Sequence, residues 1–293
     1  MILKKPKFWD KKISIYSIIL IPLTVLVTLI IFLKKKITKS IKFNIPIICV
    51  GNIYIGGTGK TPASIFLAKE LSALGLRPVI IRKYYNNHKD EHDLIKANFS
   101  NLILDRDRIN GIKDAEKANY DIVVLDDGFQ DYKIQKDLNI ICFNENQLIG
   151  NGLVLPSGPL RENLKSLNNA HIILIIGKVN KEFEKKILSA NKNVEIFYAN
   201  YKPINLEQFK NKKLLAIAAI GNPDNFFKLI KKYNLIVEKE LVYPDHYQFS
   251  EKEIENIIKE AENNNYHIIM TEKDYFKFKN NKINKLNYLK VSL

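Results

Sequence analysis

The feature that most constrains this chain is a glycine-rich turn between an apolar run and a helical pattern. The turn reads Gly-Gly-Thr-Gly-Lys-Thr-Pro over residues 56–62; it follows the β-branched run Ile45–Val50 and precedes a helical pattern over Ala63–Leu74. Glycines let the backbone curl so that successive N–H groups point at phosphate oxygens, and a helix N-terminus adds partial positive charge. A strand, such a turn and a helix in this order predict a phosphate-binding loop on a parallel sheet.

Lys60 and Thr61 give this turn its expected chemistry. The Lys60 ammonium would reach the β- and γ-phosphates and the Thr61 hydroxyl would ligate Mg²⁺, so we expect ATP and Mg²⁺ as cofactors. The strict motif begins with glycine, whereas Tyr54 holds that position here, and the alternative is a glycine turn with an incidental lysine. The predicted nucleotide-binding residues are Tyr54, Ile55, Gly56, Gly57, Thr58, Gly59, Lys60 and Thr61.

Two adjacent carboxylates follow a second apolar run. Ile122–Leu125 reads as a buried strand and ends in Asp126 and Asp127. Ligands of open α/β sheets bind at the carboxyl ends of the strands, and paired carboxylates suit a hydrated Mg²⁺. Asp-Asp-Gly is also a common turn, but together with the glycine turn the pair predicts metal ligands.

Short apolar runs alternate with helical patterns along most of the chain, which predicts an α/β fold with a parallel sheet covered on both faces. The pattern restarts near residue 200, which indicates a second, smaller α/β unit. The expected organisation is a membrane anchor with basic flanks over 1–42, a P-loop core over 43–204 and a smaller α/β domain over 205–293. The other expected strands are Pro78–Arg82, Leu138–Phe143, Ile172–Ile176, Lys213–Ile220, Val237–Val242 and His267–Thr271, and the other expected helices are Pro223–Tyr233 and Glu251–Asn263.

Basic side chains gather around one apolar run near the N-terminus. Residues 1–43 hold ten lysines and one aspartate, and so carry +9 of the net charge of +15. Within them, Ile13–Leu33 is a run of 21 residues without a charged side chain, close to the ~20 that cross a hydrocarbon core as a helix. This placement predicts membrane lipids as partners and no nucleic acid, and nothing in the sequence points to an obligate protein partner.

This run has two alternatives to a membrane-spanning helix. A cleaved signal peptide is disfavoured, because no small-x-small cleavage site follows the run and lysines do follow it. Lysines flank both ends and Pro22 would kink the helix, so a helix lying in the membrane interface stays open.

The two cysteines each lie inside an apolar, strand-like run. Cys49 and Cys142 therefore read as buried, reduced core residues, and neither a disulfide framework nor a zinc site is supported.

At this point the motifs, in their order and spacing, resemble the tetraacyldisaccharide 4′-kinases of lipid A biosynthesis over essentially the whole chain. The pieces that carry the resemblance are the apolar N-terminal run, Val50-Gly51-Asn52 with the glycine turn, residues 126–130 (DDGFQ), 150–152 (GNG), 155–162 (LPSGPLRE), 221–223 (GNP), Asp245-His246 and 271–274 (TEKD). The resemblance implies transfer of the ATP γ-phosphate to a tetraacylated disaccharide 1-phosphate, a lipid A precursor, to form lipid IVA. It also implies a place at the bacterial inner membrane, with the catalytic domain on the cytoplasmic side where ATP is available.

The same resemblance implies further site residues. Asp90 aligns with the family's catalytic aspartate, the candidate base, and His246 with its histidine partner. Arg161 and Glu162 would contact substrate phosphate and metal respectively, although a salt bridge at a helix start explains them equally well. Taken without the family, the charged run around Asp90 reads as a solvated loop, and Pro-Asp-His as turn chemistry.

The chain also departs from the family in three places. Relatives have glycines where Lys83–Asn87 stands, a glycine in place of Lys89, and a histidine in place of Asp131. These departures leave the glycine turn intact and bear on the site for the acceptor sugar.

A membrane-tethered GTPase or partition-type ATPase that recruits partners as a switch is the rival interpretation. A GTPase needs an Asn/Thr-Lys-x-Asp motif to read guanine, and neither residues 180–183 (NKEF) nor 271–274 (TEKD) supplies it.

Overall fold

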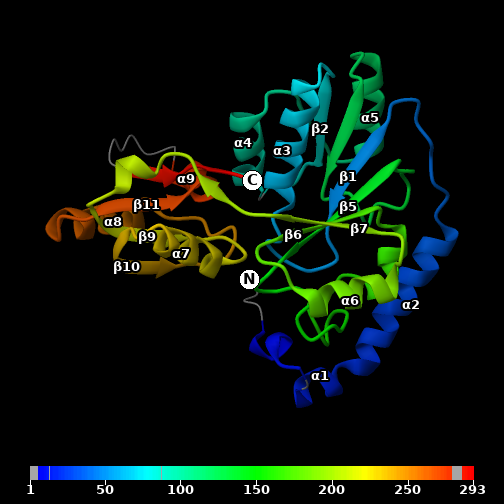
Figure 1. Ribbon diagram of the computed structural model, residues 1–293, viewed down its shortest axis with the longest axis horizontal. Coiled ribbons are helices and arrows are strands. Elements are labelled where there is room, and N and C mark those ends of the chain that lie inside the picture. Colours follow the sequence, from blue (N-terminus) through cyan, green and yellow to red (C-terminus); the bar gives the residue numbers. More distant parts are fainter. Residues whose placement is uncertain (1–5, 13, 87, 279–285) are drawn as a thin grey trace. The chain divides into compact units, whose positions relative to one another are not determined.

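The chain forms two compact units in the computed structural model, which describes residues 6–12, 14–86, 88–278 and 286–293 (Figure 1). The larger unit comprises Lys5–Tyr84 and Asn101–Asn200. The smaller unit comprises Tyr201–Leu293 and also takes Tyr85–Ser100 from the first half of the chain.

A seven-stranded parallel sheet forms the centre of the larger unit, in the order β3-β2-β4-β1-β5-β6-β7 (Figure 1). This confirms the predicted α/β fold with a large parallel sheet. The expected strands are present within one or two residues, and β3 and β7 are additional strands that the sequence pattern did not reveal. The strands are β1 (Ile47–Gly51), β2 (Pro78–Lys83), β3 (Leu102–Asp105), β4 (Ile122–Asp126), β5 (Leu138–Asn144), β6 (Ile172–Ile176) and β7 (Glu195–Ala199).

Helices cover this sheet and bury its apolar strands. α3 (Lys60–Ala73) packs on β1, β2 and β4, and α5 (Arg108–Lys117) packs on β2 and β3. α6 (Lys181–Ala190) adds Phe183 to the core, and the 3-10 helix η2 (Leu164–Asn169) packs against α6. Cys49 and Cys142 are fully buried and free in this core, as predicted, and burial raises the pKa of each thiol to about 12.

The apolar N-terminal run is divided into two helices rather than forming one. After the 3-10 helix η1 (Lys7–Asp10), α1 (Ile15–Ile19) ends at Leu20, and α2 (Ile21–Ile37) begins there with Pro22 in its first turn, a position that suits proline. Ile13 lies outside the described residues. Among the helices of the described chain, none combines the length and the apolar character needed to span a membrane.

The smaller unit is built on a four-stranded parallel sheet in the order β10-β9-β11-β12. Alternate residues of β9 face two separate cores, Leu214 and Ala216 on one side and Leu215 and Ile217 on the other, so both faces are covered. Its elements are α4 (Lys89–Asn98), β8 (Lys202–Pro203), η3 (Leu206–Phe209), β9 (Lys213–Ala218), α7 (Pro223–Lys232), β10 (Ile236–Val242), α8 (Glu251–Asn263), β11 (His267–Thr271), α9 (Glu272–Phe278), β12 (Leu286–Leu289) and β13 (Val291–Ser292).

Candidate active site

The glycine turn leads from β1 into α3 as the sequence predicts. Gly59 is the N-cap of α3 with φ 88°, a left-handed conformation that glycine adopts without strain, and no side chain caps this helix end among the described residues. Val50 on β1 pairs with Asp126 on β4, so the carboxyl ends of these two strands are adjacent. The first N–H groups of α3 and the carboxylates at the end of β4 therefore belong to the same edge of the sheet.

Thr61 and Asp126 are brought together at this edge. The Thr61 hydroxyl donates to Asp126 Oδ2 at 3.1 Å, and the Ser64 hydroxyl donates to Asp126 Oδ1 at 3.0 Å. The guanidinium of Arg82, at the end of β2, donates to Asp126 and, at 3.2 Å, to Thr61 Oγ1. Asp126 is fully buried and Arg82 almost so, and this pairing satisfies a carboxylate that would otherwise be costly to bury.

Lys60 and Asp127 form a second pair beside the first. Lys60 Nζ lies 3.7 Å from Asp127 Oδ1, and Arg161 Nη1 lies 3.0 Å from the same oxygen. Burial lowers the pKa of Lys60, and Asp127 opposes that effect. Burial alone would raise the pKa of Asp127, but the cations of Lys60 and Arg161 outweigh it and hold that pKa well below its usual range. Lys60, Asp127 and Arg161 therefore form one charged cluster at this edge of the sheet.

The residues at the start of the predicted nucleotide set have structural contacts. Tyr54 is fully buried in the core, and the Ile55 N–H donates to the carbonyl of Pro159 at 2.9 Å. Thr58 Oγ1 accepts a hydrogen bond from Asn52 Nδ2 at 2.9 Å, which ties the turn to the end of β1. Tyr54, in place of the motif's first glycine, therefore fills space in the core beneath the turn.

Oxygen donors at this edge of the sheet have the chemistry that Mg²⁺ prefers. The Thr61 hydroxyl and the Asp126 carboxylate are adjacent, and Arg82 already lies against both as a positively charged group. The residues thus fit a divalent cation at Thr61 and Asp126, with Asp127 held by Lys60.

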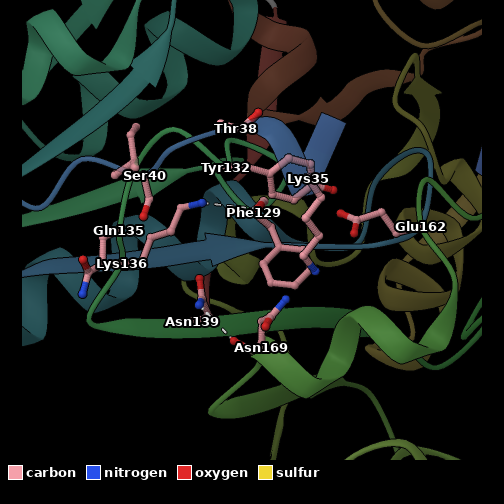
Figure 2. Close-up of a pocket in the computed structure, with 11 residues that line it drawn as sticks. Lys35, Thr38, Ser40, Phe129, Tyr132, Gln135, Lys136, Asn139, Glu162 and Asn169 are labelled. Carbon is pink, nitrogen blue, oxygen red and sulfur yellow. Dashed lines mark hydrogen bonds between the residues drawn. The ribbon is translucent and has the colours of Figure 1, made fainter. Parts of the chain in front are cut away.

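Glu162, the fourth predicted metal ligand, has a different setting. It lines a cavity of about 300 Å³ with Phe129, Tyr132 and Lys136 (Figure 2). Burial, together with the nearby Glu162 carboxylate, raises the pKa of Tyr132, which is hydrogen-bonded to Glu162. Glu162 is 5% exposed, and its Oε1 has no partner among the described residues. Its role as a metal ligand stays a prediction.

The second set of predicted residues meets in the smaller unit. Asp90 lies in the first turn of α4, and His246 lies in the loop between β10 and α8 with φ 57°, a strained backbone conformation for a residue other than glycine. His246 Nδ1 is 3.1 Å and 3.2 Å from the two carboxylate oxygens of Asp90. Burial would raise the pKa of Asp90, but the hydrogen bond from His246 and the charges of Lys273 and Lys277 lower it to about 2.

A lysine on α9 lies among the same groups. Lys273 Nζ is 2.9 Å from Glu91 Oε1, 3.1 Å from Asp245 Oδ1 and 3.5 Å from His246 Nε2. Ligand atoms of His88, Glu91 and His246 lie within 4.8 Å of one another, a spacing suited to a metal ion. The Lys273 ammonium already contacts Glu91 and His246 of this group, so its positive charge lies where a metal ion would bind.

Several of these contacts were missed in the sequence. The charged run around Asp90, read alone as a loop, is a helix that buries Asp90 and Ile95. Arg82 carried a readable signal, since it ends a predicted strand and pairs with Asp126 in the register of β2 and β4. Lys273 belongs to the motif at residues 271–274 that carries the family resemblance, but nothing in that motif places it beside Asp90.

Two of the family departures have visible structural settings. Lys83 ends β2, and the Tyr84 N–H continues the pairing by donating to Asp105 O at 2.8 Å; Asn87 lies outside the described residues. Asp131, where relatives have histidine, lies 3.4 Å from Arg108 Nη1, so its carboxylate is paired within the larger unit.

A parallel α/β sheet with a glycine turn, a lysine and paired carboxylates at the carboxyl ends of its strands defines a P-loop nucleotide-binding protein. Residues 16–293 match the family model described as tetraacyldisaccharide-1-P 4′-kinase, and the chain belongs to that family.

Similar proteins agree with this assignment. The chain is 42% identical to a tetraacyldisaccharide 4′-kinase of Pelagibacter ubique, over 100% of this chain and 94% of the relative, and 32% identical to one of Rickettsia canadensis, over 93% and 88%. The crystal structure of LpxK from Aquifex aeolicus in complex with ATP has the same fold, with a TM-score of 0.71, 23% identity, and coverage of 94% of this chain and 93% of that one.

Proposed function

We propose that this chain is an ATP-dependent kinase that transfers the γ-phosphate of ATP to the 4′-hydroxyl of tetraacyldisaccharide 1-phosphate, forming lipid IVA. The observation that carries the proposal is the pairing of Lys60 with Asp127 and of Thr61 with Asp126 at the start of α3, in a chain that matches the family over residues 16–293. Phosphoryl transfer requires positive charge held in place around the phosphates. The N-terminus of α3, Lys60 and Arg161 would supply that charge.

Mg²⁺ would be held by the Thr61 hydroxyl and the Asp126 carboxylate, with Glu162 as a further candidate ligand. When bound, it would neutralise charge that develops on the phosphate oxygens. Lys60 would hold the β- and γ-phosphates, and Asp127 would keep Lys60 in place. Arg161, 3.0 Å from Asp127, would add a second cation for the transferred group.

Asp90 and His246 would remove the proton of the sugar hydroxyl as a pair. Asp90, the candidate base, would accept that proton, and His246, whose Nδ1 lies 3.1 Å from Asp90 Oδ1, would orient the carboxylate and tune its charge. General-base help of this kind is typically worth ~10²–10⁴ in rate.

The direct test is transfer of labelled γ-phosphate from ATP-Mg²⁺ to tetraacyldisaccharide 1-phosphate in detergent micelles. Wild type should label the lipid, Lys60→Ala should not, and Lys69→Ala, an exposed lysine of the same helix, should behave as wild type. ATP hydrolysis by wild type without any labelled lipid would reject the acceptor and favour the rival, a membrane-tethered P-loop ATPase or GTPase that acts as a recruitment module.

We further propose that α1 and α2 attach the chain to the cytoplasmic face of the bacterial inner membrane. α2 exposes large apolar side chains along its length, including Leu26 at 52%, Ile30 at 55% and Phe32 at 58%, and carries three lysines in its last turn. Apolar area and lysines together bind an anionic membrane surface, and a tethered enzyme meets an acylated substrate in two dimensions.

Membrane attachment is tested by flotation with vesicles of anionic phospholipid. Wild type should float with the vesicles, and Leu26→Glu with Ile30→Glu should remain at the bottom while keeping its ATP affinity. Equal flotation of both proteins would reject α2 as the attachment surface.

A further inference from the structure

The cavity that Glu162 lines also reaches the end of α2 (Figure 2). Lys35, from the last turn of α2, and Ser40, which follows the helix, line its exposed side, the mouth of the cavity. Its volume of about 300 Å³ is at the lower end of the roughly 300–1,000 Å³ of small-molecule sites. The cavity therefore suits a ligand the size of a lipid headgroup rather than a whole lipid.

Two buried oxygen atoms at this cavity lack hydrogen-bond donors. Glu162 is 5% exposed and Asn139 is 8% exposed, and neither Glu162 Oε1 nor Asn139 Oδ1 has a hydrogen-bond partner within the described part of the chain. The other end of the Asn139 amide is fixed, since Nδ2 donates to the Asn169 carbonyl at 2.9 Å (Figure 2). Buried acceptors without donors cost free energy, so a ligand for this cavity should bring donors such as hydroxyl groups.

The two lysines of the cavity differ in how they are engaged. Lys136 Nζ already donates to the backbone carbonyls of Phe129 and Asp131. Lys35 Nζ lies 5.6 Å from the centroid of the Tyr132 ring, and this contact leaves the exposed ammonium able to bind an anion. Phe129 adds an apolar wall against which carbon atoms of a ligand can pack. Lys35 is therefore the cation that a negatively charged ligand would meet at the mouth.

The segment after α2 holds the mouth in place and exposes apolar side chains beside it. The Ile41 N–H donates to the Lys133 carbonyl at 2.8 Å, and the Gln135 N–H donates to the Ile41 carbonyl at 2.9 Å. Ile37 is 76% exposed and Ile41 is 44% exposed. The mouth thus lies among apolar and basic side chains of the kind that bind an anionic membrane surface.

Part of the cavity lies toward the ends of the strands that are opposite to the phosphate loop. Asn139 is the second residue of β5, and Asn169 ends η2 just before β6 begins. The contact between Thr61 and Asp126 lies instead at the carboxyl end of β4. A ligand held at Asn139 would therefore occupy a different place from the transferred phosphate.

We propose that this cavity binds the headgroup of an anionic phospholipid that carries free hydroxyl groups, as phosphatidylglycerol does. The hydroxyls would donate to Glu162 Oε1 and Asn139 Oδ1, and the phosphate would lie against Lys35 at the mouth, away from the Glu162 carboxylate. A bilayer phospholipid suits this place because the mouth includes the end of α2. The inference goes beyond the proposed kinase function and rests on the proposed attachment of α2 to the membrane.

The first arm of the experiment compares vesicles that differ only in headgroup hydroxyls. Full-length wild type should bind vesicles containing phosphatidylglycerol roughly tenfold more tightly than vesicles with the same fraction of phosphatidylethanol, which has the same charge and no hydroxyl. Ser40→Trp, which fills the mouth, should bind both kinds equally, whereas Ser72→Trp, at an exposed serine of α3, should keep the preference. Cosedimentation measures the affinities. Wild type without a preference, or Ser40→Trp with an undiminished one, would overturn the proposal.

Further variants test the hydrogen bonds and the cation separately, and Glu162 is left unchanged in all of them because it is also a candidate metal ligand. Asn139→Ala should lose most of the preference for phosphatidylglycerol; if this variant does not fold, Ser40→Trp decides. Lys35→Gln should weaken binding to phosphatidylglycerol vesicles more than Lys36→Gln does, because of these two neighbours Lys35 lines the cavity. Equal losses in the two lysine variants would mean that general surface charge binds the vesicles, and would overturn the role of Lys35.

The last arm tests which lipid occupies the cavity. In neutral detergent micelles without phospholipid, Ser40→Trp should keep the wild-type KM for tetraacyldisaccharide 1-phosphate. A KM raised severalfold would mean that the sugar phosphate of the acceptor occupies the cavity, and would overturn the phospholipid assignment. If the vesicle preference and its loss appear but wild type never phosphorylates the lipid, the kinase assignment fails while the headgroup site stands.

Discussion

The two charged clusters of this protein are built in different ways. The cluster around Asp126 lies at the ends of neighbouring strands of one sheet, and strand register alone brings Arg82 and Asp126 together. The cluster around Asp90 needs three segments that are far apart in sequence: the start of α4, the loop at residues 245–246 and the start of α9. The first holds its carboxylates with arginine and lysine, whereas the second also contains a histidine against a carboxylate. Positive charge suits the holding of phosphates, and a carboxylate paired with an imidazole suits the removal of a proton.

The largest effect is expected from a substitution in the first cluster, which should impair ATP binding as well as the rate. Lys60→Ala should lower kcat/KM roughly 10³-fold and weaken ATP binding, because the phosphates lose their nearest side-chain cation. Displacement of a fluorescent ATP analogue measures the binding, and lipid phosphorylation measures the rate. If Lys60→Ala binds ATP as wild type does and only the rate falls, Lys60 acts on the transition state alone, and the cluster would not be a nucleotide-holding site.

The next effect concerns stability and tests how much the buried Arg82–Asp126 pair of the first cluster contributes to the free energy of unfolding. Asp126→Asn should lower the free energy of unfolding by about 3 kcal/mol, because it leaves the Arg82 guanidinium buried without its carboxylate. Asp114→Asn, at an exposed pair with Lys117, should cost less than about 1 kcal/mol. Urea unfolding followed by circular dichroism compares the two. Equal costs would mean that the buried pair is not a determinant of this sheet edge.

The same contrast explains what could be predicted from the sequence. The glycine turn, its flanking strand and α3 follow from a local pattern, and the Ser250–Glu253 capping box marks the start of α8. The parallel sheet was predicted because its strands are short apolar runs. The short strands β3 and β7 were missed because none of their residues is fully buried, so their apolar patterns are weak.

The second cluster could not be derived from local pattern. Asp90 lies in a charged run, and nothing in that run shows that α4 packs on α9 and buries the carboxylate. Only the family resemblance singled out Asp90 and His246, and the structure brings them to hydrogen-bonding distance. The apolar N-terminal run is a similar case. Its composition predicts one long helix, whereas in the structure α1 ends at Leu20 and α2 begins there.

A smaller effect is expected from the histidine of the second cluster. His246→Gln should lower kcat roughly 10²-fold, because Asp90 loses the imidazole that orients it and tunes its charge, while ATP affinity stays as in wild type. The comparison with Lys60→Ala is informative, since that variant should lose both. A parallel loss of ATP affinity in His246→Gln would break the division of labour between the clusters.

The smallest effect is the pH dependence of stability that Asp90 contributes in the second cluster. The pKa of Asp90 is lowered from its ordinary 3.8 to about 2, by contacts with His246, Lys273 and Lys277 that overcome the effect of burial. A carboxyl with a lower pKa in the folded than in the unfolded state binds its proton more weakly when folded. Its stabilisation of about 2 kcal/mol is therefore present above pH ~4 and is lost as the pH falls through ~2.

Asp90→Asn isolates this contribution, because the amide does not titrate. The variant should be less stable than wild type by about 2 kcal/mol at pH 7, and the difference should shrink toward zero between pH ~4 and ~2, as measured by urea unfolding across that range. Asp114→Asn, whose carboxylate is exposed, should show almost no such trend. A difference between Asp90→Asn and wild type that stays constant down to pH ~2 would mean that the amide acts through lost packing. In that case the charges of Lys273 and Lys277 would not be what holds Asp90 ionised in the fold.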